Sequence, residues 1–157
     1  RLLKVEETAA RLSLPLKVMN ADIRNTDWWD GQQFDRILAD VPCSSSGVIR
    51  RHPDIKLLRR DSDINGLAKI QLKILKSLWK TLKPGGRLLY VTCSIFSDEN
   101  QNVVETFLQE QIDASENRML PNSIIQDLML RRSVGYQVLP GMHDVDGFYY
   151  ACLEKSG

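Results

Sequence analysis

The feature that most constrains the fold is a pair of apolar, strand-like segments with a helix-length amphipathic segment between them. The first, residues 34–40, ends in an acid, and the second, residues 87–93, ends in a cysteine. Between them, apolar residues recur at helical spacing from about residue 61 to 82, and Lys-Pro-Gly-Gly at 83–86 is typical of a helix end. A strand, a helix and a strand in this order predict neighbouring strands of a doubly wound α/β sheet.

The remaining segments extend this alternation. We expect a helix at 2–12 with its apolar residues on one face, a strand at 16–19, a helix that begins near 97 and runs to 108, a short helix within 123–129, and final strands at 136–139 and 147–153. Because no helix separates the last two strands, they predict a C-terminal antiparallel hairpin at a sheet edge. Residues 1–157 are therefore predicted to form one α/β domain, mostly parallel, with helices on both faces of the sheet.

Composition narrows the class of protein. The chain has 157 residues, a net charge of +1 and three widely spaced cysteines, with no Cys-x-x-Cys pair and no histidine at metal-ligand spacing. It shows neither a signal peptide nor the ~20 consecutive apolar residues that a membrane span needs. We therefore expect a cytoplasmic protein with free thiols, no metal and no membrane partner. The sequence begins at Arg1 without a methionine, which suggests a fragment or a processed chain.

Reactive residues follow the predicted strands. Asp22 follows the strand at 16–19, Asp40 and Cys43 follow the next, and Cys93 closes the strand at 87–93. Ligands of doubly wound sheets bind beyond the carboxyl ends of the strands. A single strand-terminal cysteine is usually a small buried apolar residue. Because neighbouring strands lie ~4.8 Å apart, two such cysteines at the same end can share one pocket, which favours a reactive site.

Two long motifs make a resemblance specific. Asp-Val-Pro-Cys-Ser at 40–44 with Gly-Val-Ile-Arg-Arg-His-Pro-Asp-Ile-Lys at 47–56, and Leu-Tyr-Val-Thr-Cys-Ser at 89–94, resemble the Nop/Sun family of RNA cytosine-5 methyltransferases. Within that family the chain is similar to the bacterial branch that acts on small-subunit ribosomal RNA. Asp-Gly-Phe-Tyr at 146–149 resembles the family's closing strand. The likeness runs from about residue 1 to 155 and implies a class I, Rossmann-like methyltransferase fold with S-adenosylmethionine as cofactor.

The resemblance also implies roles for single residues. Carbon 5 of cytosine is a poor nucleophile, and addition of a thiolate to carbon 6 activates it by covalent catalysis. Cys93 matches the attacking cysteine, and Cys43 matches the second cysteine, which assists release of the methylated product. Asp40 matches the acid that contacts the cytosine ring near the methionine end of the cofactor, and Asp22 the acid on the adenine side.

A basic cluster is the candidate RNA-binding segment. Arg50, Arg51 and Lys56 belong to a run of cationic residues between positions 50 and 60. A charge run of this kind is usually a solvated surface. Beside the family motif, it is expected to contact phosphates of ribosomal RNA or to order the pocket loop.

The chain also departs from the family pattern. Val41 stands where the family usually has alanine, and residues 44–46 are three serines, but neither change removes a reactive group. The glycine-rich cofactor loop, the acid that holds the ribose and the N-terminal RNA-binding domain are not in the sequence. We therefore expect the first strands of the catalytic domain to be missing, S-adenosylmethionine to bind weakly or not at all, and an exposed sheet edge to promote self-association.

Two alternatives remain open at the level of sequence. In a DNA cytosine methyltransferase the Pro-Cys turn supplies the nucleophile, which would assign attack to Cys43; the Thr-Cys-Ser match at 92–94 and the Arg-Arg-His-Pro loop argue against this. A non-catalytic RNA-binding or assembly module could also keep a methyltransferase fold. The reactive set of Asp40, Cys43 and Cys93 argues against it for a full-length enzyme, but fold alone does not establish function.

Overall fold

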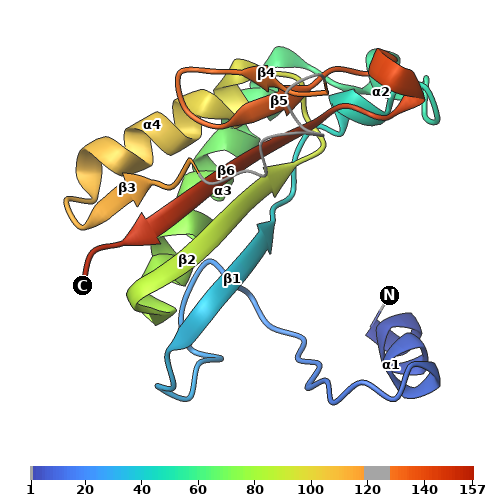
Figure 1. Ribbon diagram of the computed structural model, residues 1–157. Coiled ribbons are helices and arrows are strands. Elements are labelled where there is room, and N and C mark those ends of the chain that lie inside the picture. Colours follow the sequence, from blue (N-terminus) through green and yellow to red (C-terminus); the bar gives the residue numbers. More distant parts are fainter. Residues whose placement is uncertain (1, 119–127) are drawn as a thin grey trace.

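The computed structural model describes residues 2–118 and 128–157. Its helices and strands, shown in Figure 1, are α1 (Leu2–Arg11), β1 (Phe34–Asp40), the 3-10 helix η1 (Ser46–Val48), α2 (Ile55–Leu58), α3 (Asp61–Thr81), β2 (Leu82–Thr92), η2 (Ser97–Glu99), α4 (Gln101–Glu110), β3 (Ala114–Glu116), β4 (Leu130–Arg131), β5 (Tyr136–Val138), η3 (Met142–Asp144) and β6 (Phe148–Lys155). Most of the short helix expected within 123–129 falls outside the described residues.

The strands form one mixed sheet in the order β1-β2-β6-β5-β4, with β3 paired to β6. Strands β1 and β2 are parallel, and the other described pairs are antiparallel. The α/β class and the pairing of the two C-terminal strands are confirmed. However, β6 lies inside the sheet against β2, so the hairpin is not itself at the edge. The edge on that side is formed instead by β4, which pairs with β5, and by β3, which pairs with β6 (Figure 1).

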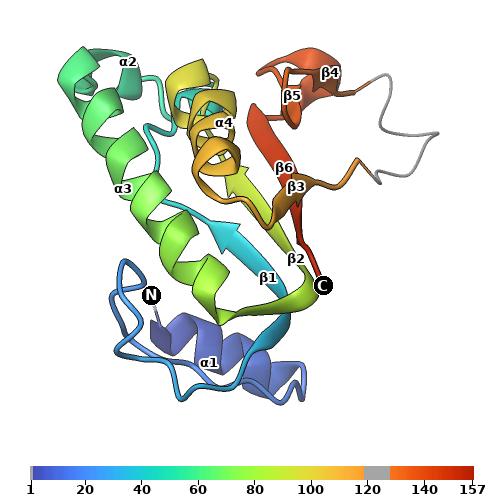
Figure 2. The same ribbon diagram turned by 90° about the vertical axis from the view of Figure 1, so that its left-hand side faces the viewer.

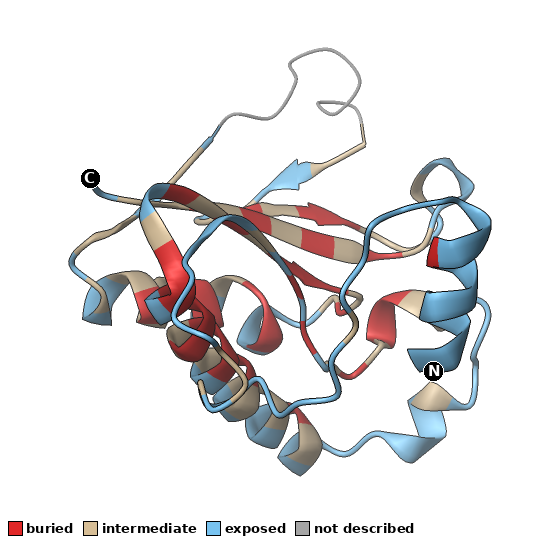
Figure 3. Ribbon diagram, turned by 90° about the horizontal axis from the view of Figure 1, so that it is seen from below, coloured by how far each residue is buried: buried red, intermediate tan, exposed pale blue. Residues whose placement is uncertain are grey.

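Helices α3 and α4 lie side by side on one face of the sheet, as Figure 2 shows. This differs from the expectation of helices on both faces. Helix α1 forms as predicted, but of its residues only Ala9 is buried, and its apolar residues Leu2 and Val5 remain exposed (Figure 3). An amphipathic stripe predicts a helix but does not say which surface the helix packs against. In this chain α1 leaves most of its apolar residues uncovered.

The strand expected at 16–19 is not formed. These residues lie in a connection without regular structure, and Leu16 and Met19 are exposed. An isolated strand cannot satisfy its backbone hydrogen bonds, and no neighbouring strand in the described part of the chain lies beside this one. The strand at 34–40, in contrast, is observed with the predicted bounds because β2 pairs with it.

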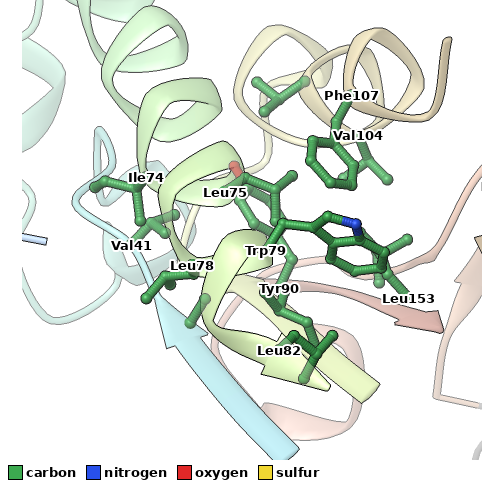
Figure 4. Close-up of a cluster of buried hydrophobic side chains, with 14 of the residues drawn as sticks. Val41, Ile74, Leu75, Leu78, Trp79, Leu82, Tyr90, Val104, Phe107 and Leu153 are labelled. Atoms are coloured by element: carbon green, nitrogen blue, oxygen red, sulfur yellow. The ribbon is translucent and has the colours of Figure 1, made fainter. Parts of the chain in front are cut away.

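The core lies between α3, α4 and the covered face of the sheet (Figure 4). Trp79 is its largest fully buried side chain, with its ring edge-on to Phe107 at a centroid distance of 5.1 Å. The indole N–H donates a hydrogen bond of 3.0 Å to the carboxylate of Asp113, so the buried polar atom has a partner. The same face of α3 contributes Ile74, Leu75 and Leu78, so this helix anchors the sheet.

Replacing Trp79 with alanine is expected to lower the free energy of unfolding by about 3–5 kcal/mol, because the cavity cannot be filled by neighbours that are already packed. Urea unfolding followed by circular dichroism measures the change. The matched control is Ile112→Ala, since Ile112 is fully exposed and its loss should change stability by less than about 0.5 kcal/mol. Equal effects of the two substitutions would contradict this description of the core.

Candidate active site

The candidate site lies where β1 and β2 end together. The two strands are parallel, with Asp40 in register with Val91, and the ladder closes with the Val41 N–H donating 3.2 Å to the carbonyl of Val91. Beyond this point the loop after each strand carries one cysteine. The Sγ atoms of Cys43 and Cys93 lie 3.3 Å apart, and both thiols are partly buried. The structure thus brings the two strand-end cysteines together at one site, in direct contact.

The contact between the thiols makes their acidities unequal. The hydrogen bond from Cys43 lowers the pKa of Cys93 to about 6, with a further contribution from the Ser45 hydroxyl at 3.6 Å. Burial and the nearby charge of Asp40 oppose this shift. The same hydrogen bond, together with burial, raises the pKa of Cys43. The lowered pKa favours the thiolate at Cys93 and the raised pKa favours the donating S–H at Cys43, which is the division of roles that a nucleophile with a partner requires.

A close backbone approach holds the two loops together. The Gly47 N–H donates 2.9 Å to the carbonyl of Cys93, and the Gly147 N–H donates 2.8 Å to the carbonyl of Gly47. A Cβ atom on Gly47 would lie 2.1 Å from the Gly147 carbonyl oxygen, so no larger residue fits. This contact brings the loop before β6, with its Asp-Gly-Phe-Tyr sequence, against the cysteine loops.

The two candidate cofactor acids occupy different surroundings. Asp40 is exposed at the carboxyl end of β1, close enough to Cys93 for its charge to affect that thiol. Asp22 lies in the connection before β1 and forms an ion pair of 2.6 Å with Arg24, whose hydrogen bonds lower the pKa of Asp22 to about 2. Both carboxylates are open to solvent and able to accept hydrogen bonds from hydroxyl or amino groups.

The basic residues divide into two groups. Arg50 and Arg51 form ion pairs with Asp144 and Asp146 of the loop before β6. Lys56 instead lines a cavity of about 250 Å³. Charged residues Arg59, Arg60 and Asp61 also line the cavity. Its remaining lining residues are Ser46 and the apolar Ile49, Ile55, Ile64, Ile95 and Phe96. The cationic run predicted from the sequence includes Arg59 and Arg60, but spacing alone does not show which cations of such a run face a cavity.

Among the described residues, no group of three or more histidine, cysteine or acidic side chains is arranged to hold a metal ion. Within the same residues, no helix combines the length and apolar content that crossing a membrane requires.

An α/β sheet with paired thiols and an acid at its strand ends defines the class of protein, a methyltransferase fold with a candidate covalent site. The family description "16S rRNA methyltransferase RsmB/F" matches residues 1–154, and the chain belongs to this family. It is 50% identical over 157 residues to Ribosomal RNA small subunit methyltransferase B of Shewanella oneidensis, and 49% identical over 160 residues to that of Vibrio vulnificus. These alignments cover 99% of this chain but only 35% and 34% of the two relatives, so the chain spans about a third of their length.

A solved structure shares the fold. NSun6 from Pyrococcus horikoshii, crystallised with SFG, superposes with a TM-score of 0.80 at 27% identity and covers 100% of this chain and 39% of its own. The likeness supports the α/β methyltransferase architecture derived above.

Replacing Gly47 with alanine is expected to destabilise the protein by about 1–3 kcal/mol, because the added methyl overlaps the Gly147 backbone and the loops must move apart. Gly66→Ala is the matched control: Gly66 lies in α3, a Cβ there meets nothing within 4 Å, and helix propensity predicts a gain of about 0.5–1 kcal/mol. Urea unfolding of both variants tests the contact. A neutral Gly47→Ala would show that the loops are not tightly apposed.

Replacing Cys43 with alanine is expected to raise the pKa of Cys93 from about 6 toward its ordinary value near 9, since the thiolate loses its main hydrogen-bond donor. The measurement is the pH dependence of Cys93 alkylation by iodoacetamide, read by mass spectrometry of the peptide. Cys152→Ala, which removes the one cysteine outside the pair, should leave the midpoint unchanged. A Cys93 midpoint that is the same in all three proteins would refute the thiol–thiolate contact.

Proposed function

We propose that this chain is part of an S-adenosylmethionine-dependent enzyme that methylates carbon 5 of a cytosine in small-subunit ribosomal RNA through a covalent Cys93–cytosine adduct. The observation that carries the proposal is the pair of thiols 3.3 Å apart, one with a lowered and the other with a raised pKa. Family membership and the names of the curated relatives support ribosomal RNA as the substrate class.

Cys93 performs the first step. Its thiolate adds to carbon 6 of the ring, a sulfur–carbon bond forms, and the displaced electron pair builds negative charge towards N3. A carboxyl group at Asp40, on the neighbouring strand end, would supply a proton or a strong hydrogen bond to N3. The ring then has the electron density of an enamine at carbon 5. After methylation, N3 returns its proton to Asp40. A base, for which solvent water suffices, takes the carbon 5 proton as the carbon 6–sulfur bond breaks, and the expelled Cys93 thiolate leaves the aromatic ring restored.

Cys43 serves the last step. While Cys93 is a free thiolate, it holds the S–H of Cys43 in a hydrogen bond. Once Cys93 is bonded to carbon, its sulfur is neutral and a weak acceptor, so the Cys43 thiol is released from this contact. It is then available beside the adduct to assist elimination of the methylated product. Both thiols must be reduced for this chemistry, in keeping with a cytoplasmic location.

The exposed carboxylates fit part of a cofactor site. S-adenosylmethionine supplies the methyl group when bound. Asp40 stands at the carboxyl end of β1, where doubly wound sheets bind ligands, and we assign it to the methionine end. Asp22 would accept hydrogen bonds from the adenine side after exchange of its exposed ion pair with Arg24. The structure of NSun6 with SFG lends support by similarity of fold.

RNA is expected to approach over the basic cavity. Lys56, Arg59 and Arg60 would attract phosphates beside the thiol pair, and Phe96 at the cavity wall offers an apolar surface to a base. Arg50 is paired with the almost fully exposed Asp144. An exposed pair of this kind contributes little to stability, so a phosphate can replace the carboxylate.

A covalent trap tests the reaction. The upstream-extended protein is mixed with S-adenosylmethionine and small-subunit ribosomal RNA that contains 5-azacytosine, and the products are separated on a denaturing gel. A shifted band is expected for the wild type and for Cys152→Ala, and none for Cys93→Ala. With ordinary RNA, Cys43→Ala should accumulate the adduct because release is impaired. The present chain alone is expected to give no band.

The other outcomes separate the alternatives. A band that is lost in Cys43→Ala and kept in Cys93→Ala would assign attack to Cys43, as in DNA cytosine methyltransferases. If the extended protein binds the RNA without any band, the chain belongs to a non-catalytic RNA-binding or assembly module.

A further inference from the structure

A carboxylate is fully buried next to the thiol pair. Glu99, the last residue of η2, has no solvent exposure. Removing a carboxylate from water is costly unless hydrogen bonds replace its hydration. The hydrogen-bond partners of Glu99 therefore stabilise its buried carboxylate. The identity of these partners shows which segments of the chain Glu99 connects.

Its partners come from both cysteine loops. One oxygen of Glu99 accepts the Ser44 N–H at 2.8 Å and the Gln71 amide at 3.1 Å, and the other accepts the Ser94 hydroxyl at 2.6 Å. Ser44 directly follows Cys43, and Ser94 directly follows Cys93. One carboxylate therefore joins the two residues that succeed the two thiols.

A cluster of buried hydroxyls also ends on Glu99. Ser44, Ser46 and Ser94 are buried, and their Oγ atoms lie 3.1–3.2 Å from one another. Each hydroxyl donates one hydrogen, so a closed set of hydroxyls benefits from an acceptor that need not donate. The carboxylate of Glu99 is that acceptor. No buried side-chain nitrogen or oxygen among the described residues is left without a partner.

We propose that Glu99 is a positioning residue, which holds the Cys43 loop and the Cys93 loop together and thereby sets the contact between the two thiols. It acts through Ser44 and Ser94 and touches neither the thiols nor the substrate. Its effect on methyl transfer rests on the proposed function, whereas its effect on the thiols does not.

The position of this contact favours a local role over a general one. Pairing of β1 with β2 ends at Asp40 and Val91, and the following Val41–Val91 hydrogen bond is the last of the ladder. Both thiols lie beyond it, where the Gly47–Cys93 backbone bond and Glu99 connect the loops. Loss of Glu99 should therefore change the Cys43–Cys93 geometry more than the sheet.

The experiment compares Glu99→Ala and Glu99→Gln in the full-length protein. Glutamine keeps one acceptor oxygen for Ser44 and Gln71 and offers an N–H to Ser94. The Ser94 hydroxyl can then donate its own hydrogen to Ser44 or Ser46 instead, so glutamine should preserve the connection. The first readout is the pH midpoint of Cys93 alkylation by iodoacetamide. The second is the split between kcat and KM with ribosomal RNA, and thermal melting verifies the fold. Glu110→Gln is the matched control, since Glu110 lies on the surface of α4 and forms an ion pair with Lys76 of α3.

In Glu99→Ala, the Cys93 midpoint is expected to rise above its value of about 6. Because misplacement of a reacting group by ~1 Å costs about 100-fold in rate, kcat should fall by up to that factor with little change in KM. Glu99→Gln and Glu110→Gln should stay close to wild type in both readouts. A folded Glu99→Ala with an unchanged Cys93 midpoint and unchanged kcat would overturn the proposal, as would a Glu110→Gln variant with the same defects.

If Glu99→Ala does not fold, Ser94→Ala tests the same connection, because it removes the hydroxyl through which Glu99 reaches the Cys93 loop, together with its contacts to Ser44 and Ser46. It should also raise the Cys93 midpoint, and an unchanged midpoint would refute the role of Glu99. The alkylation readout needs neither RNA nor cofactor. If the wild type forms no covalent adduct, the proposed reaction fails while the thiol measurement still decides the role of Glu99.

Discussion

Parallel pairing of β1 with β2 is the constraint on which the rest of the site depends. Because the strands run in the same direction and Asp40 is in register with Val91, the segments that leave them emerge side by side. Cys43 and Cys93, 50 positions apart in sequence, can then approach to 3.3 Å. Helix α3 makes the parallel arrangement possible, since it carries the chain back along the covered face and buries Trp79 and Leu75 against the sheet.

The site combines a reactive pair with a rigid polar support. Two thiols in contact cannot both ionise easily, so a shared proton makes one a thiolate and the other a donor. Beneath them, Glu99 and the serine hydroxyls form a network in which every buried polar group has a partner. Such networks stabilise one geometry only when they are complete. The reactive thiols and the hydrogen-bonded network of Glu99 and the serines therefore form one arrangement.

The N-terminal quarter of the chain differs from the rest. Leu38 on the outer edge strand is exposed, and large apolar residues are exposed on α1 and along the connection that follows it (Figure 3). The chain spans about a third of the length of its curated relatives. Exposed apolar surface beside an unpaired strand edge is a physical reason for association, and self-association of this chain remains a prediction.

The sequence by itself determined the bounds of β1, the long helix α3 and the pairing of the last two strands, because each has a strong local pattern of apolar residues. It also located both cysteines at strand ends. The strand expected at 16–19 failed, since pairing depends on a neighbour and not on propensity. Only the tertiary structure decided that Arg50 and Arg51 pair with Asp144 and Asp146, and that Glu99 joins the loops after Cys43 and Cys93. The two Arg–Asp pairs and the Glu99–Ser44 contact connect residues about 55 to 95 positions apart, and no local pattern records which distant partner a charged side chain meets.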